Sequence, residues 1–209
     1  MLTVYGKPQL LVTKSFIVIF GIIVAAYGED HSSALRDGPC PDIKNALSID
    51  IAKFSGNWYG AKENRYGAKE NSLDILGRVN CSLLTLQRHG ADQWAVLYSG
   101  ISQKTKERLS VTATAKILDK KTTIVNYNFI SSVPLVKTYW VLSTDYIRKA
   151  IVVSCEQVGS QHQIQLWSNK RSPEDCSSDD DEEDLANAMR TLGINITMTP
   201  ISQLGCVYY

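Results

Sequence analysis

The side chains most able to do chemistry in this 209-residue chain are five cysteines, Cys40, Cys81, Cys155, Cys176 and Cys206. No two of them form a Cys-x-x-Cys pair, and the three histidines lie far from them in the sequence. Structural zinc sites need closely spaced cysteines and histidines, so we expect no metal site. In an oxidising compartment such cysteines form disulfides, and the odd count leaves one thiol unpaired or available to another chain.

Signatures of other reactions are missing from the sequence. There is no Gly-x-Ser-x-Gly elbow, no phosphate-binding loop and no close Ser-His-Asp set. An acidic run, Asp179 to Asp184, has two interpretations: a calcium site or docking patch, or the solvated start of a helix. No calcium-loop spacing or glycine accompanies it, so we favour the second. The formal net charge of +1 does not suggest a nucleic acid or an anionic membrane as the main partner.

The first 28 residues have the pattern of a secretory signal peptide. Lys7 and Lys14 precede an uncharged apolar run at 16–26, and small residues follow at Ala26 and Gly28. The alternative is a signal anchor, but the run is shorter than the roughly 20 apolar residues of a membrane-spanning helix. We therefore expect cleavage after residue 28, a secreted, extracellular protein and no stable membrane insertion.

Two sequons, Asn80-Cys81-Ser82 and Asn195-Ile196-Thr197, are expected to carry N-linked glycans. The second is the safer prediction, because a disulfide on Cys81 would hinder the transferase at Asn80.

From about residue 79 to 169 the chain reads as short strands, which alternate apolar and polar residues with a period of two, as half-buried strands do. The clearest series are Leu109, Val111, Ala113, Ala115 and Ile117; Val125, Tyr127 and Phe129; and Trp94, Val96 and Tyr98. Further strands are expected at 139–143, 146–155 and 162–167. Turn signals separate these segments, so an all-β sandwich or barrel is predicted.

The pattern changes near the C-terminus. Residues 181–192 carry apolar side chains at helical spacing, with Ser177 or Ser178 as a candidate N-cap and Gly193 as a stop. A last strand is expected at 194–199. Upstream, the sequence YGAKEN at 59–64 recurs at 66–71. A shift of seven would point the same side chains to opposite faces of one strand, so we expect the second copy in a loop or after a bulge.

Three motifs resemble the lipocalin family, in the family's order: FSGNWY at 54–59, which contains Gly56 and Trp58; the turn Thr144-Asp145-Tyr146; and the basic residue Arg171. The segment YWVLSTDY at 139–146, the opening CPDI at 40–43 and the ending at 198–206 are especially similar to apolipoprotein D and the insect Lazarillo and bilin-binding lipocalins.

This resemblance implies an eight-stranded antiparallel up-and-down β-barrel (the lipocalin calyx) over residues 40–206, with one C-terminal α-helix, a final short strand and an N-terminal arm at 29–39. It places Arg171 over the Trp58 indole at the closed end, as a cation–π contact. Asn169 and Lys170 depart from the apolar residues usual before that arginine.

The same resemblance implies the disulfides Cys40–Cys155 and Cys81–Cys206. Cys176 is then left over, either as a thiol for intermolecular contact or as a shielded, inert one.

The resemblance also suggests a ligand site inside the barrel, which in an eight-stranded barrel is just wide enough for one small molecule. Trp140 is the first choice, because the matching tryptophan lines the pocket in this branch, and Leu142 is expected on the same face. The other candidates, any of which could be ordinary core, are Val125, Tyr127, Phe129, Leu84, Leu86, Trp94 and Tyr98.

The expected function is that of a carrier of a small hydrophobic ligand, with no required cofactor and no catalysis. Candidate ligands are lipids, fatty acids, sterols, retinoids and bilins, with a possible link to lipid transport or protection against oxidative stress. One alternative is an isomerase with a free cysteine in the calyx; Cys81 is the only candidate, and the implied pairing would consume it. The other is a protein-interaction module that inhibits a protease or binds host factors.

Overall fold

A computed structural model describes residues 35–64, 79–128 and 135–208. Three predictions concern residues outside these ranges: the signal peptide at 1–28, the second YGAKEN copy at 66–71, and Phe129.

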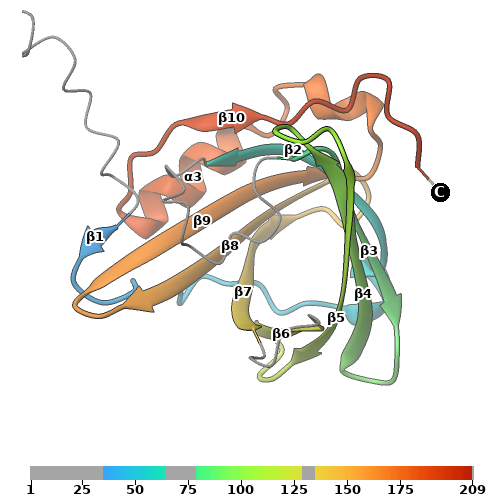
Figure 1. Cartoon of the computed structure of the whole chain (residues 1–209). Helices are drawn as coiled ribbons and strands as arrows, with labels where there is room; N and C mark the ends of the chain where they lie inside the picture. Colours follow the sequence, from blue (N-terminus) through green and yellow to red (C-terminus); the bar gives the residue numbers. More distant parts are fainter. Residues whose placement is uncertain (1–34, 65–78, 129–134, 209) are drawn as a thin grey trace, which may run out of the picture. The chain divides into compact units, whose positions relative to one another are not determined.

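Eight antiparallel strands close into a barrel, because β9 pairs with β2 as well as with β8 (Figure 1). Their bounds are β2 Gly56–Asn64, β3 Val79–Arg88, β4 Gln93–Ser102, β5 Arg108–Ile117, β6 Thr122–Asn128, β7 Leu135–Thr144, β8 Lys149–Val158 and β9 Gln161–Lys170. Two short strands extend the sheet: β1, Arg36–Asp37, pairs with β9, and β10, Met198–Pro200, pairs with β2. The predicted all-β, eight-stranded antiparallel barrel is confirmed.

The described helices are α2 (Ile51–Phe54), the 3₁₀ turn η1 (Glu174–Ser177) and α3 (Glu182–Leu192). The helix expected near 181–192 is confirmed, and Gly193 ends it with a φ of 64° and an N–H bonded to the carbonyls of Arg190 and Met189. The predicted serine cap is wrong, because Asp181 occupies the N-cap position.

The last strand begins later than expected. Met198 pairs with Asn64, the final residue of β2, so the residues before Met198 lie beyond the end of that partner strand. Ile194 is instead buried against α3.

Apolar side chains form two cores, one on each side of the sheet. The inner core lies inside the barrel and is built around Trp58, Phe54 and Trp94. The outer core lies between α3 and the outer faces of β8 and β9, where Leu185 packs with Leu166. The barrel wall formed by β8 and β9 is therefore covered on its outside, while its inside faces the lumen (Figure 1).

Candidate ligand-binding site

The closed end of the barrel is held by Arg171, which follows β9. Its guanidinium carbon lies 3.7 Å from the centroid of the Trp58 ring, and Trp58 is 1% exposed. The guanidinium also donates hydrogen bonds of 2.8 to 3.1 Å to four backbone carbonyls, those of Lys53, Ser55, Asn57 and Tyr146. Arg171 thus contacts Trp58 as the resemblance implies, although polar residues precede it.

The turn between β7 and β8 is built by Thr144 and Asp145. The Thr144 hydroxyl accepts from the N–H of Tyr146 and donates to the carbonyl of Lys149. The Asp145 carboxylate accepts from three successive backbone N–H groups, at residues 147 to 149. These bonds hold the chain in a turn, so the next strand begins at Lys149 rather than at Tyr146 as predicted.

Both disulfides implied by the resemblance are present, Cys40–Cys155 and Cys81–Cys206. Cys176 is left as a free thiol, 6% exposed, with its sulfur 3.5 Å from the carbonyl of Ser172. Burial raises the pKa of this thiol to about 12. Of the two alternatives for Cys176, a thiol for intermolecular contact or a shielded one, the structure has the shielded one.

The acidic run lies at the start of α3 and most of its residues are exposed, as expected, but it also forms ion pairs with buried lysines that were not expected. Lys62 on β2 bonds the carboxylates of Asp179, Asp181 and Glu182, and Lys170 on β9 pairs with Asp181 and its neighbour at 180. Lys62 is 7% exposed, whereas Lys170 and Asp181 are fully buried. The run therefore neutralises two buried lysines and holds the segment before α3 against the barrel.

Side chains of the inner core fill the half of the barrel next to the closed end. Among the residues expected to bind ligand, Leu86, Trp94 and Val125 point inward and are buried in this core. The Trp94 indole N–H donates to Ser55 Oγ at 2.9 Å, which ties it to the closed end. These three residues form the floor of the barrel interior.

The half of the barrel towards the other end is lined by aromatic side chains that are only partly buried. Strand register puts Tyr139 of β7 on the same inner face as Tyr127 of β6, and their hydroxyl oxygens lie 2.5 Å apart. The Tyr139 ring lies 5.7 Å from that of Trp167 on β9. Tyr98 and Leu84, from the predicted set, face this region from β4 and β3.

Polar and charged groups also line this half of the barrel, away from the closed end. Lys137 and Glu156 form an inward-facing ion pair at 3.8 Å, with side chains 16% and 49% exposed. Ser82 Oγ donates to the Tyr98 hydroxyl at 3.2 Å. Burial raises the pKa of Tyr127, and that of Tyr139 well above its usual value, so both phenols stay protonated at neutral pH. The lining thus combines apolar rings with neutral hydroxyl groups and one ion pair.

The expectation that Trp140 and Leu142 face the barrel interior is wrong. Trp140 pairs with Val153, and both Trp140 and Leu142 pack with the outer core beneath α3. Because α3 covers this wall, β7 is apolar on both faces, and its sequence does not indicate which face points inward. The inward residues that were missed are Tyr139, Trp167, Lys137, Glu156 and Ser82.

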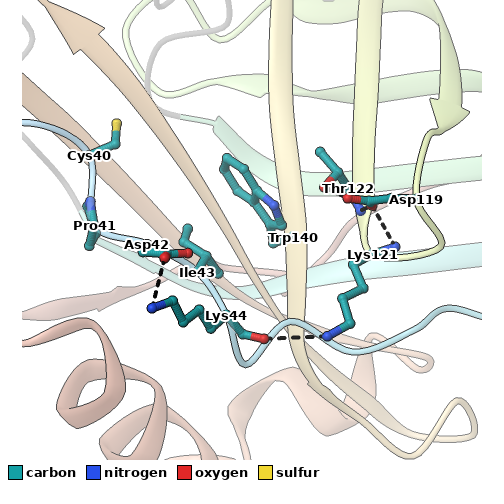
Figure 2. A pocket seen from close by; sticks show the side chains of 9 residues that line it. All are labelled: Cys40, Pro41, Asp42, Ile43, Lys44, Asp119, Lys121, Thr122 and Trp140. Carbon is teal, nitrogen blue, oxygen red and sulfur yellow. Dashed lines mark hydrogen bonds and ion pairs between the residues drawn. The ribbon is translucent and has the colours of Figure 1, made fainter.

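A pocket of 530 Å³ lies on the outer side of the barrel, where the segment at 40–44 passes Trp140. Figure 2 shows the Trp140 indole between this segment and the turn before β6. The lining residues are Cys40, Pro41, Asp42, Ile43, Lys44, Asp119, Lys121, Thr122 and Trp140.

Two further searches covered the described residues alone. Within them, no group of three or more His, Cys, Asp or Glu side chains is placed to hold a metal ion. None of the helices there has the length and apolar character needed to cross a membrane.

Solved structures with the same barrel include three informative ones. Lobster apocrustacyanin A1 aligns with a TM-score of 0.66 and 15% identity over 82% of this chain and 92% of its own. Insecticyanin from the tobacco hornworm Manduca sexta aligns with a TM-score of 0.60 and 20% identity, over 76% and 82%. The siderocalin Ex-FABP, described as functioning through dual ligand specificities, aligns with a TM-score of 0.51 and 18% identity, over 75% and 95%.

No family model matches the chain, and neither does any curated protein sequence. At the identities above, the likeness to solved structures extends to the architecture of the barrel. Together with the closed eight-stranded sheet and the helix packed against it, these alignments show that the chain has the lipocalin fold.

Proposed function

We propose that this protein is a lipocalin that carries a small hydrophobic ligand inside its barrel. The observation that carries the proposal is the contrast between the two halves of the interior. The closed half is filled by buried side chains around Trp58, whereas the inward rings of Tyr127, Tyr139 and Trp167 remain partly accessible. Apolar linings with a few placed polar groups are typical of small-molecule sites.

The lining suggests an amphipathic ligand. Trp167 and Leu84 offer apolar contact, while the Tyr127–Tyr139 pair can exchange its mutual hydrogen bond for one to a ligand oxygen. Lipids, fatty acids, sterols, retinoids and bilins all meet this description. The similarity to a siderocalin described by its ligand specificities supports a binding role. The motif resemblance extends the proposal to the apolipoprotein D, Lazarillo and bilin-binding branch, and to lipid transport or protection against oxidative stress.

We propose binding rather than catalysis. The isomerase hypothesis required a free cysteine in the calyx, and Cys81, its only candidate, is bonded to Cys206. No cofactor is needed for a carrier, so a bilin, where present, would be the bound ligand.

Secretion is part of the same proposal. It rests on the apolar leader at 1–28, followed by an arm at 29–39 and the barrel domain at 40–206. Disulfides are typical of extracellular proteins. Asn195 is exposed and is the proposed glycan site. Asn80 is half-buried and its side-chain oxygen accepts from Gln103 at 2.7 Å, which makes it the poorer acceptor.

The test is native mass spectrometry of the protein secreted from insect cells, with an absorption spectrum and an organic extract of the same sample. A stoichiometric small molecule that is lost on denaturation supports the carrier, and a blue sample identifies a bilin. A ligand-free protein that also binds none of a panel of fluorescent fatty acids, sterols and retinoids would contradict it and favour the protein-interaction alternative.

A matched pair of variants locates the site. Trp167→Leu removes an inward ring and is expected to weaken ligand binding by about tenfold, as loss of a well-packed aromatic contact does. Trp140→Phe changes the outer face of β7, which is separated from β9 by β8, and is expected to leave the affinity unchanged. The reverse result would place the carried ligand outside the barrel.

A further inference from the structure

The outer pocket beside Trp140 lies across the barrel wall from the proposed calyx. Trp140 and Tyr139 are consecutive residues of β7, and successive side chains of a strand point to opposite faces. Tyr139 contacts Trp167 inside the barrel, whereas Trp140 packs with Ile43 and Val153 outside it. The two sites therefore share a wall but no lining side chain.

The segment at 40–44, which forms one side of this pocket, is fixed to the barrel at both ends. Cys40 is bonded to Cys155 of β8, and the N–H of Leu47 donates to the carbonyl of Val141 at 2.8 Å. These attachments bracket the lining segment, residues 40–44, at both ends. The pocket therefore exists without a ligand, which lowers the ordering cost of binding.

The aromatic wall of the pocket carries a hydrogen-bond donor. The Trp140 side chain is partly exposed, and its indole lines the pocket. An indole face provides stacking area for a flat apolar molecule, and its N–H provides one directed contact.

The two charged side chains nearest Trp140 on the β6 side of the pocket, Asp119 and Lys121, differ in how far their hydrogen bonds are made. The Asp119 carboxylate already accepts from the N–H groups of Lys121 and Thr122 and from the Thr122 hydroxyl. The Lys121 ammonium contacts only the carbonyl of Lys44, at 3.5 Å, among the described residues (Figure 2). Lys44 forms an exposed ion pair with Asp42, of the kind that exchanges readily with solvent.

We propose that this outer pocket is a second ligand site, which takes a planar aromatic carboxylate. The ring stacks on the Trp140 indole beside Ile43, and the carboxylate accepts hydrogen bonds from the Lys121 ammonium, with Lys44 close by. The volume of 530 Å³ falls within the range of about 300 to 1,000 Å³ that is usual for small-molecule sites. The proposal does not depend on the carrier function of the barrel.

Isothermal titration calorimetry with 2-naphthoate tests the proposal, with neutral 2-naphthamide as the matched ligand. We expect 2-naphthoate to bind with 1:1 stoichiometry and 2-naphthamide at least about tenfold more weakly, because the amide lacks the charge that Lys121 recognises. Lys121→Gln and Trp140→Leu should each weaken 2-naphthoate by about tenfold or more. Lys116→Gln, an exposed lysine elsewhere on the barrel, is the matched control and should bind as the parent does.

Circular dichroism checks that Trp140→Leu folds, since Trp140 also packs against the outer core; Lys121 is a surface residue, and its variant tests the pocket by itself. No binding of 2-naphthoate to the parent, or equal binding of the acid and the amide, would overturn the proposal. The proposal would also be overturned if Trp167→Leu lost binding of 2-naphthoate while Lys121→Gln bound it as the parent does, because the probe would then occupy the barrel. Failure here leaves the fatty-acid and retinoid titrations of the barrel unaffected, so the two proposals fail separately.

Discussion

The guanidinium of Arg171 stacks on the Trp58 indole at 3.7 Å while its N–H groups bond four backbone carbonyls. One side chain thereby joins the end of β9 to α2, to the start of β2 and to the turn after β7. Arg171 thus links four segments of the chain at the closed end of the barrel.

Replacing Arg171 should therefore destabilise the fold. For Arg171→Ala we expect a loss of about 3 kcal/mol in the free energy of unfolding, from charge-assisted hydrogen bonds and the cation–π contact together. Arg171→Lys retains the charge without the planar guanidinium, so its free energy of unfolding should fall between those of the parent and Arg171→Ala. Urea denaturation measures the free energy of unfolding of both variants. Arg148→Ala, which removes an exposed ion pair with Asp145, is the control and should cost less than about 1 kcal/mol; equal losses at the two positions would contradict the role given to Arg171.

Asp181 and Asp179 bond the same lysine but differ in burial. Asp181 is fully buried between Lys62 and Lys170 and accepts a hydrogen bond from Ser168, whereas the Asp179 side chain is 81% exposed. Asp181→Ala should cost about 3 kcal/mol or more, because it leaves buried cations short of a partner. Asp179→Ala should cost less than about 1 kcal/mol. Thermal unfolding of the two variants compares them directly. Similar melting temperatures would show that buried Asp181 contributes no more to stability than exposed Asp179.

The Lys170–Asp180 pair should make stability fall at acid pH. The hydrogen bond from Lys170, with one from Ser178, lowers the pKa of Asp180 from 3.8 to about 2. A group with a lowered folded-state pKa contributes stability that is complete above its unfolded value and is lost as pH falls through the folded value. The contribution should therefore decline between pH 3.8 and about 2.

Urea unfolding at several pH values tests this decline in the parent and in Asp180→Asn. The difference in unfolding free energy between the two should shrink as pH falls across that window, because the parent carboxyl becomes neutral like the amide. Asp180 is partly exposed, so solvent screening keeps the difference small. A difference that stays constant from neutral pH to pH 2 would show that ionisation of Asp180 does not stabilise the folded protein.

The Cys176 thiol should be inert in the folded protein. Its burial and its raised pKa, about 12, keep it protonated and out of reach of a disulfide reagent at pH 8. We expect no reaction with Ellman's reagent under native conditions and one thiol after denaturation without reductant. Cys176→Ser supplies the blank. Rapid reaction of the native protein, or a reducible dimer on a gel, would restore the alternative of intermolecular contact through Cys176.

Local sequence was a good guide wherever one face of an element is wet. The alternation of β5 and of β6 predicted strands and inward faces, because their outer faces are exposed to solvent. Gly193 was recognisable as a helix stop, since its left-handed conformation favours glycine. The inward position of Tyr98 followed from Val96 and Trp94, two and four residues away.

The same reasoning failed where both faces of a strand are covered. In β9 the apolar Ile164 and Leu166 face outward under α3, while Gln163 and Gln165 face the lumen, so apolar residues do not mark the inside. On β7 the family resemblance pointed to Trp140, and the strand's own pattern, apolar on both faces, did not indicate Tyr139 instead. Nothing in the local sequence indicated that Lys62 and Lys170 would be buried in ion pairs. The carboxylate partners of Lys62 lie far along the chain, and those of Lys170 are separated from it by the 3₁₀ turn η1.

The amino-acid sequence by itself indicated most of the strands and the helix, and the family resemblance added the contact of Arg171 with Trp58 and the cysteine pairing. Those features depend on periodicity and on short motifs, which are local. Only the tertiary structure decided which face of β7 and β9 points into the barrel, that the acidic run neutralises buried lysines, and that a pocket forms beside Trp140. Each of these depends on where α3 and the segment at 40–44 pack, which is a contact between distant parts of the chain.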